Sequence, residues 1–351
     1  MKVLLTGHKG YIGSVLTPLL LERGHEVTGL DSDLFADCTY YGELSDIKSF
    51  DVDVRDADAE CLRGFDAIIH LAGLSNDPLG DYNPSLTQDI NTDASVRLAR
   101  LAKSAGVQRF LFASSCSTYG AAGESFLDET AHFNPVTPYG HSKVDVEKQV
   151  SEIADDSFSP TYLRASTAYG LSPRIRFDLV VNNLVAWAFT TGEIHLKSDG
   201  SPWRPLVHVR DIALAYVSAL EAPLDAVHLQ AFNVGNTAEN YQIRDVAEIV
   251  SQVVPGSKIG FADDAGPDTR NYRVDCNRIS LQLHSFKPQW TVRRGIEELY
   301  DAFCRNGLEL HDFEGERYKR IAHIQKMISN GSLEPDLRRA SAKNARTGTD
   351  A

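Results

Sequence analysis

The stretch that decides the fold is Val3-Leu4-Leu5-Thr6-Gly7-His8-Lys9-Gly10-Tyr11-Ile12-Gly13. Residues 2–5 are apolar without alternation, which predicts a buried parallel strand. Residues 11–23 carry apolar side chains at helical spacing, so a helix follows the strand directly. The glycines between them leave free backbone N–H groups that a pyrophosphate can approach. We assign this stretch to dinucleotide binding, through Gly7, Gly10, Tyr11, Ile12 and Gly13, the alternative being a tight turn that binds nothing.

The rest of the first half repeats this alternation of strand and helix. Strands are expected over residues 26–31, 65–73 and 109–114, and a helix over 95–105. This order predicts an α/β protein with a Rossmann-type, doubly wound parallel sheet, whose ligand crevice lies at the carboxyl ends of the strands.

The second half has a different pattern. After about residue 160, segments rich in Pro, Gly and Asp, such as residues 199–205 and 263–268, indicate a smaller and loop-rich C-terminal α/β lobe. We expect an NAD-binding domain over residues 1–165, a substrate lobe interleaved with it over 166–315, and a basic helix with a disordered tail over 316–351.

Composition excludes several classes of function. The formal net charge of −13 disfavours nucleic-acid binding. Five scattered cysteines without a Cys-x-x-Cys pair argue against a zinc site and a disulfide framework, and no metal is expected. The immediate first strand leaves no room for a signal peptide, and no apolar run has membrane-spanning length, so a cytoplasmic protein without membrane contact is expected. The basic end of the chain could bind a partner or a membrane surface, but packing on the protein body is favoured.

Two acidic positions point to NAD. Asp31 ends the second expected strand, where a carboxylate accepts hydrogen bonds from the adenosine ribose and repels a 2′-phosphate. Asp33 could share this role or be solvated. Asp53 and Val54 follow the next short strand and suit the edge and face of adenine, although for Asp53 a surface carboxylate is nearly as good an interpretation.

A second motif supplies proton-transfer chemistry. Thr137 and Pro138 are typical of a helix start, which places Tyr139 and Lys143 one turn apart on one face. A free tyrosine has a pKa of about 10, and a nearby ammonium favours its phenolate. Tyr139 could then take a proton from a sugar hydroxyl, Lys143 could also bind the nicotinamide ribose, and Ser115 could hold the reacting oxygen. An ordinary helix surface is the alternative.

Together these motifs resemble the extended short-chain dehydrogenases/reductases, in particular their nucleotide-sugar epimerase/dehydratase branch, over residues 1–310. The resemblance also rests on His70-Leu71-Ala72-Gly73, Asn91, the run from Ser115 to Gly120, and the run from Trp203 to Asp211. It implies a homodimer formed through helices 95–103 and 144–153. It also implies site roles: Ser115, Tyr139 and Lys143 in catalysis, Leu71, Ala72 and Gly73 beside the nicotinamide, and Asn183, Arg204 and Arg270 on a nucleotide diphosphate, where each arginine could equally form a surface ion pair.

The chain departs from the family pattern at the catalytic end. Dehydratases of this branch place Asp-Glu after the catalytic Ser or Thr, whereas this chain has Cys116 and Ser117. Dehydration is therefore disfavoured, and Cys116 is expected to be a buried small side chain. The segment with Ser75, Asn76 and Asp77 should overhang the sugar, either to bind hydroxyls or to cap the next helix. Two further arginines, Arg174 and Arg176, lie in an irregular segment that should face the sugar, the alternative being a solvated loop.

The combined interpretation is NAD-dependent epimerisation of a nucleotide-diphosphate sugar, most simply at C4 through a transient keto-sugar, with Tyr139 as the base. Rival interpretations are a dehydratase, decarboxylase or keto-sugar reductase on the same scaffold. A non-catalytic NAD-sensing regulator is a rival of another class, although such a sensor would need only the cofactor site.

Overall fold

A seven-stranded, all-parallel sheet forms the centre of the protein. The computed structural model describes residues 1–75, 83–120, 125–266 and 271–340. The strand order is β11-β7-β5-β4-β1-β2-β3, so the order reverses between β1 and β4, as in doubly wound folds. This confirms the predicted fold class. The strands are β1 (Lys2–Thr6), β2 (Glu26–Asp31), β3 (Ser49–Asp51), β4 (Ala67–His70), β5 (Arg109–Ser115), β7 (Ser159–Ala165) and β11 (Gln230–Val234).

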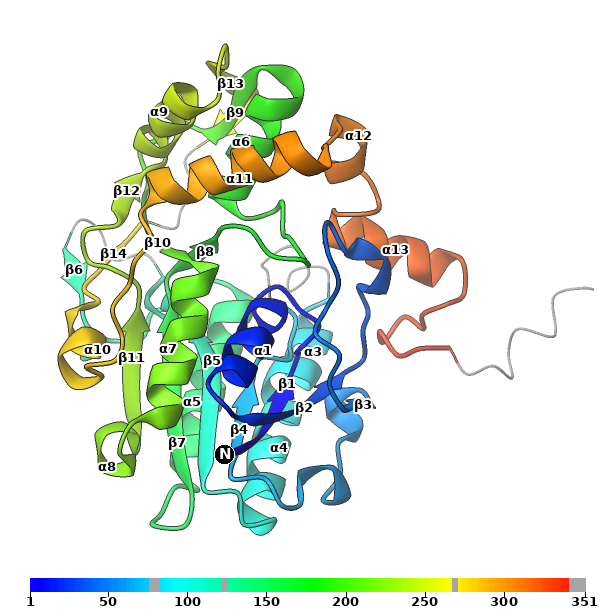
Figure 1. Ribbon diagram of the computed structural model, residues 1–351, viewed down its shortest axis with the longest axis vertical. Coiled ribbons are helices and arrows are strands. Elements are labelled where there is room, and N and C mark those ends of the chain that lie inside the picture. The colour runs from blue at the N-terminus through cyan, green and yellow to red at the C-terminus, as the bar shows by residue number, and fades with distance from the viewer. Residues whose placement is uncertain (76–82, 121–124, 267–270, 341–351) are drawn as a thin grey trace, which may run out of the picture.

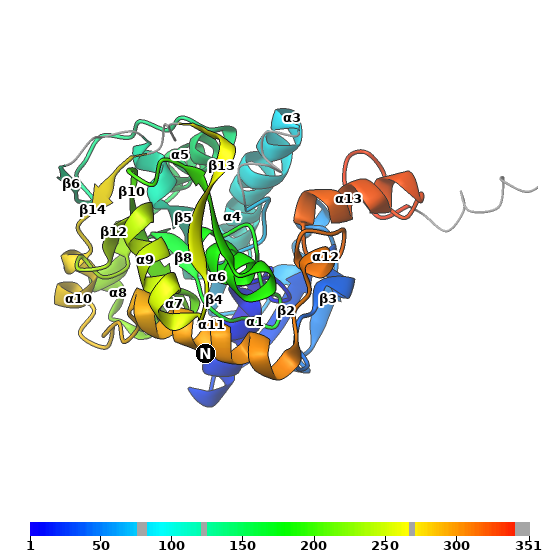
Figure 2. The ribbon, with the colours of Figure 1, turned by 90° about the horizontal axis from the view of Figure 1, so that it is seen from above.

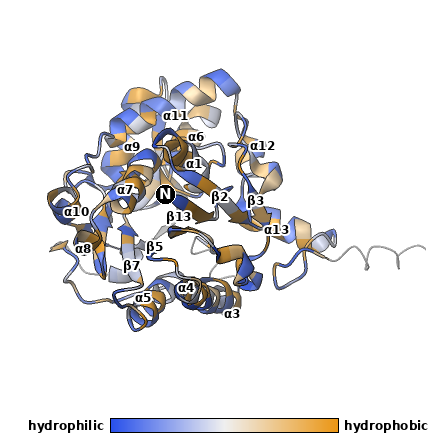
Figure 3. Cartoon of the chain, turned by 60° about the horizontal axis from the view of Figure 1, so that its bottom comes forward, coloured by the Kyte–Doolittle hydropathy of each residue, from blue (hydrophilic) through white to orange (hydrophobic). Residues whose placement is uncertain are grey.

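Helices cover both faces of this sheet, which explains why its strands are apolar without alternation. Val3 and Leu5 of β1 pack in one hydrophobic cluster with α1 and α7, whereas Leu4 packs in another with α4 and α5. Figure 3 shows α1 and α7 on one side of the strands and α3, α4 and α5 on the other. These helices are α1 (Gly13–Glu22), α3 (Pro84–Thr87), α4 (Ala94–Ser104), α5 (Pro138–Ser151) and α7 (Val209–Glu221).

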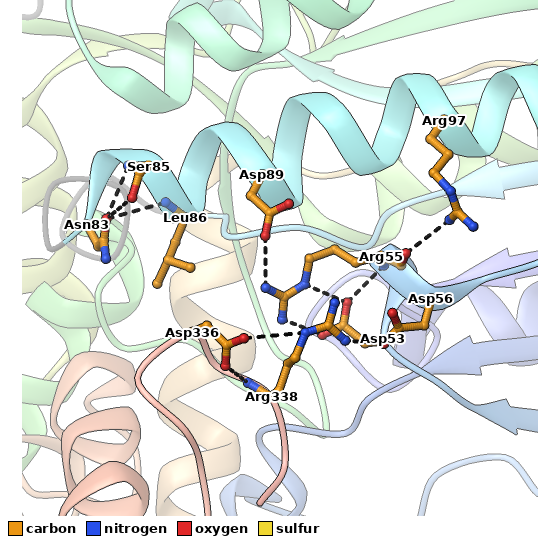
Figure 4. Close-up of polar contacts among 10 residues, drawn as sticks. All are labelled: Asp53, Arg55, Asp56, Asn83, Ser85, Leu86, Asp89, Arg97, Asp336 and Arg338. Atoms are coloured by element: carbon orange, nitrogen blue, oxygen red, sulfur yellow. Dashed lines mark hydrogen bonds and ion pairs between the residues drawn. The ribbon is translucent and has the colours of Figure 1, made fainter.

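A π-helical turn, Gln88–Asp93, joins α3 to α4. Asn83 starts α3, because its Oδ1 accepts hydrogen bonds from the backbone N–H groups of Ser85 and Leu86 (Figure 4). The proposed capping role of Ser75 is therefore wrong. Asn76 and Asp77 lie outside the described residues.

The smaller lobe has its own hydrophobic core and its own small sheets, and Figure 1 shows it above the carboxyl ends of the main strands. Its strands pair in the orders β12-β10-β8 and β13-β9, while β14 pairs with β6. Two segments expected to be irregular in fact contribute strands, β10 and β13. The strands are β6 (Phe126–Leu127), β8 (Thr167–Tyr169), β9 (Glu193–Ser198), β10 (Trp203–His208), β12 (Asn240–Gln242), β13 (Lys258–Gly266) and β14 (Arg273–Val274).

The remaining helices complete both parts of the molecule. Helices α6, α9 and α11 surround the core of the smaller lobe, while α8 and α10 pack beside β11. Because α7 and β11 return to the main sheet, the two parts are interleaved along the chain. Their bounds are α6 (Val180–Thr191), α8 (Leu224–Val227), α9 (Ile243–Val253), α10 (Asn277–Gln282) and α11 (Val292–Asn306).

The end of the chain packs on the protein body, as the sequence favoured. Helices α12 (Leu310–Phe313) and α13 (Arg320–Ser329) lie next to the segment that follows β2, as Figures 1 and 2 show. Ile324, Leu333 and Leu337 are buried in the same cluster as Leu30 of β2. Residues 341–351, where a disordered tail was expected, lie outside the described part. Within the described ranges, no helix is long and apolar enough to cross a membrane.

Candidate active site

A cavity of about 920 Å³ lies at the carboxyl ends of β1, β2, β4 and β5 and extends to the smaller lobe. Every residue assigned to cofactor binding from the sequence lines it, as do Ser115, Tyr139 and Lys143. Of the residues assigned to the substrate, Ser75, Asn183 and Arg204 also line the cavity. The other two, Asn76 and Arg270, lie outside the described residues.

The glycine loop between β1 and α1 is closed too tightly for side chains. Gly7 has φ +74° and its N–H donates to the Leu30 carbonyl at 2.8 Å. A Cβ on Gly13 would lie 2.2 Å from the Gly7 oxygen, and one on Gly7 would lie 2.8 Å from the backbone nitrogen of Ala72. This geometry fits a dinucleotide pyrophosphate on the amides at the start of α1.

The Tyr11 side chain has a structural role that the sequence did not reveal. Its hydroxyl donates to the Gly170 carbonyl at 2.8 Å, and burial raises its pKa above the ordinary tyrosine range. The hydroxyl therefore joins the glycine loop to the smaller lobe.

Asp31 ends β2 beside this loop. Its two oxygens accept hydrogen bonds from the backbone N–H groups of Lys9 at 2.9 Å and Asp33 at 2.8 Å. Each carboxylate oxygen has a further lone pair, so ribose hydroxyls can still be bound. Asp33 forms ion pairs with Lys9 and Arg174, both at 3.1 Å, and is therefore not simply solvated.

The expectation that Arg174 faces the sugar is wrong. Its guanidinium binds Asp33 and the carbonyl of Phe35 instead. Because the sequence places Arg174 far from β2, its local context held no sign of this long-range contact.

Asp53, which caps the short turn that follows β3, is fixed by Arg55. The Arg55 guanidinium binds both carboxylate oxygens, with Nη2 2.7 Å from Oδ2 and Nε 3.0 Å from Oδ1. Burial raises the pKa of Asp53, but the hydrogen bonds from Arg55 outweigh it and hold that pKa below its ordinary value. Arg55 also reaches Asp89 at 3.0 Å, as Figure 4 shows. Asp53 is thus an organised carboxylate that lines the cavity.

Tyr139 and Lys143, the pair predicted to transfer a proton, stand at the start of α5. Thr137 caps the helix, since its Oγ1 accepts from the Gly140 N–H at 3.1 Å, and Pro138 takes the first helical position. The Lys143 ammonium lies 5.3 Å from the ring centroid of Tyr139 and 4.7 Å from that of Phe112. Burial lowers the pKa of Lys143 to about 8. The lysine therefore keeps its charge at neutral pH, although only 6% of the residue is exposed to solvent.

Ser115 ends β5 and faces the cavity. Its Oγ accepts from the Ser117 N–H at 3.1 Å and lies 2.8 Å from the Ser117 hydroxyl. Cys116 is fully buried, with its Sγ 3.2 Å from the carbonyl oxygen of Arg164, and burial raises the pKa of its thiol. Cys116 is therefore a buried small side chain, as predicted.

Asn91 and Arg176 support the loop that follows β4. The Asn91 side chain binds both the N–H and the carbonyl of Leu74, at 2.7 and 2.9 Å. Arg176 lines the cavity and donates to the Ser75 carbonyl and hydroxyl, both at 3.1 Å, while Asp178 holds it at 2.6 Å. Arg176 thus contacts the segment that was expected to overhang the sugar.

Residues of the C-terminal segment also line the cavity, and sequence reasoning missed them. They carry no motif. The only signal was the basic, amphipathic pattern predicted over residues 316–329, which covers only the central part of this set. They are Phe313, Glu314, Tyr318, Lys319, Arg320, Ile321 and Leu337.

Comparison with known proteins agrees with this geometry. A family model described as the NAD dependent epimerase/dehydratase family matches residues 3–235. The chain belongs to this family. Its cofactor is NAD, for which the glycine loop and Asp31 provide a fitting site.

Individual members of the family differ in reaction. The chain is 26% identical over 333 residues to UDP-glucose 4-epimerase of Bacillus subtilis (strain 168), covering 85% of this chain and 94% of that protein. It is 28% identical over 326 residues to UDP-glucuronic acid decarboxylase 1 of Arabidopsis thaliana, covering 90% and 72%. The solved UDP-glucose 4-epimerase of Thermus thermophilus in complex with NAD has a TM-score of 0.73 at 26% identity, covering 88% and 100%.

Proposed function

We propose that the protein epimerises a nucleotide-diphosphate sugar at C4. The observation that carries this proposal is the meeting of Ser115, Tyr139 and Lys143 at one cavity whose lining carboxylates are already engaged. Among the described lining residues, Asp53 is bound by Arg55, Asp178 by Arg176 and Glu314 by Lys319. Asp31, at the adenosine region, accepts two backbone N–H groups.

The three residues have distinct roles in this reaction. Tyr139, as the phenolate, takes the proton of the C4 hydroxyl. The Lys143 ammonium stabilises the negative charge on that oxygen, and Ser115 donates a hydrogen bond to the reacting oxygen of the sugar. Bound NAD would supply a reversible hydride acceptor, which takes up the hydride that leaves with this proton and gives it back to the opposite face of the keto-sugar. After the keto-sugar has turned about its diphosphate, Tyr139 returns the proton, so the product is an isomer of the substrate.

The chemistry of residues 116 and 117 argues against dehydration. Expulsion of a sugar hydroxyl needs an acid near the catalytic serine. Cys116 is buried with a raised pKa, and Ser117 bonds to Ser115. Neither side chain is a competent acid at neutral pH, so epimerisation, which needs only the trio, is favoured.

The substrate diphosphate has candidate ligands on the smaller lobe. Asn183 on α6 and Arg204 on β10 both line the cavity. A guanidinium matches phosphate oxygens in charge and geometry. We assign these residues to the diphosphate of the substrate. A homodimer through α4 and α5 remains a prediction, which light scattering would contradict by finding a monomer.

Mass-resolved product analysis with a panel of nucleotide sugars tests the proposal. We expect a new isomer of unchanged mass without stoichiometric NAD, and no turnover by Tyr139→Phe while that variant still binds NAD. Loss of water or of carbon dioxide would instead make the protein a dehydratase or a decarboxylase. Bound NAD without any product would favour the NAD-sensing regulator, and near-normal turnover by Tyr139→Phe would remove its role as base.

A further inference from the structure

Arg320 is a cationic side chain at the cavity without an anionic partner. It is the first residue of α13 and lines the cavity, and its guanidinium carbon lies 4.1 Å from the ring centroid of Phe35. Among the residues that the structure describes, no ion pair or hydrogen bond engages this guanidinium. Its neighbours differ, since Arg174 is paired with Asp33 and Arg176 with Asp178.

A guanidinium without an ion pair or a hydrogen bond is costly at such a place. Transfer of a charge out of water needs a counter-charge or hydrogen bonds to offset the lost hydration. Burial, together with the like charge of Arg176, lowers the pKa of Arg320 to about 10, although the Asp178 carboxylate, which is paired with Arg176, opposes this. The group is still fully charged at neutral pH, so binding of an anion in the cavity would remove this cost.

The surroundings of Arg320 belong to the adenosine half of the cofactor site. Its contact residue Phe35 lies in the loop that follows Asp31. Leu34 lies in the same loop, and its carbonyl oxygen is 3.2 Å from Nε2 of His323 on α13. The candidate ligands of the substrate diphosphate, by contrast, lie on strands and helices of the smaller lobe.

The segment that carries Arg320, residues 310–340, is fixed to this half at several points. Leu337 lines the cavity and is buried in the cluster that contains Leu30 and Val54. The Arg339 guanidinium donates to the Ser32 carbonyl at 3.0 Å. Arg338 binds Asp56 and, as Figure 4 shows, reaches the region of Asp53 and Arg55 from the C-terminal segment.

We propose that Arg320 pairs with the pyrophosphate of bound NAD, and that residues 310–340 thereby hold the cofactor in the adenosine half of the cavity. The glycine loop offers backbone amides to the same pyrophosphate, while Arg320 adds a full charge from the C-terminal segment. The N-terminal amides of α13 add a smaller positive potential at the same point. A cofactor held in this way dissociates slowly, which suits an enzyme that regenerates its cofactor in each turnover.

Binding of four ligands to purified variants tests this proposal. NAD, ADP, adenosine and UDP are titrated calorimetrically, and NAD release is followed by stopped flow. Arg320→Ala and Arg320→Gln should bind NAD and ADP about 10- to 100-fold more weakly, because a hydrogen-bonded charge pair is lost. Adenosine and UDP should bind as before, and NAD should dissociate faster by a similar factor.

Arg317→Ala is the matched control. Arg317 is an exposed arginine of the same segment that does not line the cavity and donates to the Thr39 carbonyl at 3.2 Å. The Arg317→Ala variant should bind all four ligands as the unmodified protein does. The proposal is overturned if NAD affinity is unchanged in both Arg320 variants, or if adenosine and NAD weaken equally, which would indicate a packing role. A loss confined to UDP would also overturn it, because the anion would then be the diphosphate of the substrate.

Discussion

The Glu147 carboxylate lies one turn beyond Lys143 on α5 and is bound by the Arg164 guanidinium, with Nη2 2.6 Å from Oε2. Ser114 donates to the other carboxylate oxygen at 2.5 Å. Arg164 thus engages the Glu147 carboxylate, whose charge still raises the pKa of Lys143 against the effect of burial. The Lys143 ammonium faces the rings of Phe112 and Tyr139. The arrangement leaves the positive charge of Lys143 available to the phenol of Tyr139.

Replacement of Glu147 by Gln should destabilise the protein strongly. Both Glu147 and Arg164 are buried, so the variant leaves a guanidinium without its counter-charge, and we expect a loss of about 3–5 kcal/mol in the free energy of unfolding. Urea denaturation followed by circular dichroism measures it. Glu152→Gln, at the exposed end of α5, is the control and should change stability little. A similar stability for the two variants would contradict the proposed importance of the pair.

Replacement of Lys143 by Met should change the pH dependence of turnover. Since the ammonium favours the phenolate of Tyr139, its loss should raise the pKa of the phenol. We expect activity at neutral pH to fall about tenfold or more and to recover partly as the pH rises. The profile of kcat/KM against pH tests this expectation. Lys148→Met, an exposed lysine on the same helix, should keep the normal profile. A uniform loss of activity with an unshifted profile would argue against the electrostatic role.

The sequence predicted those parts of the site that depend on local geometry. The glycine loop, the helix start at Thr137 and the spacing of Tyr139 and Lys143 are all short-range patterns, and each was found as expected. The buried state of Cys116 was also found as expected. Local patterns of this kind involve only a few neighbouring residues, so they can be recognised without knowledge of the tertiary structure.

The parts that were missed depend on contacts between distant segments. Arg174 binds Asp33, more than a hundred residues away, and Arg320 reaches Phe35 from the other end of the chain. Strand β10 was missed because Pro205 lies within it, and its antiparallel partner β12 is remote in sequence. No periodicity or motif in one segment could reveal which distant segment packs against it.

Replacement of Gly13 by Ala should abolish tight NAD binding. The added Cβ would lie 2.2 Å from the backbone oxygen of Gly7, so the loop must shift and lose its approach to the pyrophosphate. We expect NAD affinity to fall at least about 100-fold, since several charge-assisted hydrogen bonds are lost together. Gly260→Ala is the control, because a Cβ there meets no atom within 4 Å. Retained NAD affinity in Gly13→Ala would show that the cofactor does not rest on this loop.

Replacement of Asp31 by Asn should weaken the preference for NAD over NADP. The carboxylate lies where the adenosine ribose is expected, and its charge repels a 2′-phosphate. Asparagine keeps the shape and one acceptor oxygen, so the variant should bind NAD more weakly but NADP more strongly, with the affinity ratio changing about tenfold or more. Parallel titrations with both dinucleotides measure the ratio. Asp51→Asn makes the same change of charge at the exposed end of the neighbouring strand and should leave the ratio as it is. If both variants changed the ratio equally, the selectivity would come from the overall charge of this edge and not from Asp31 itself.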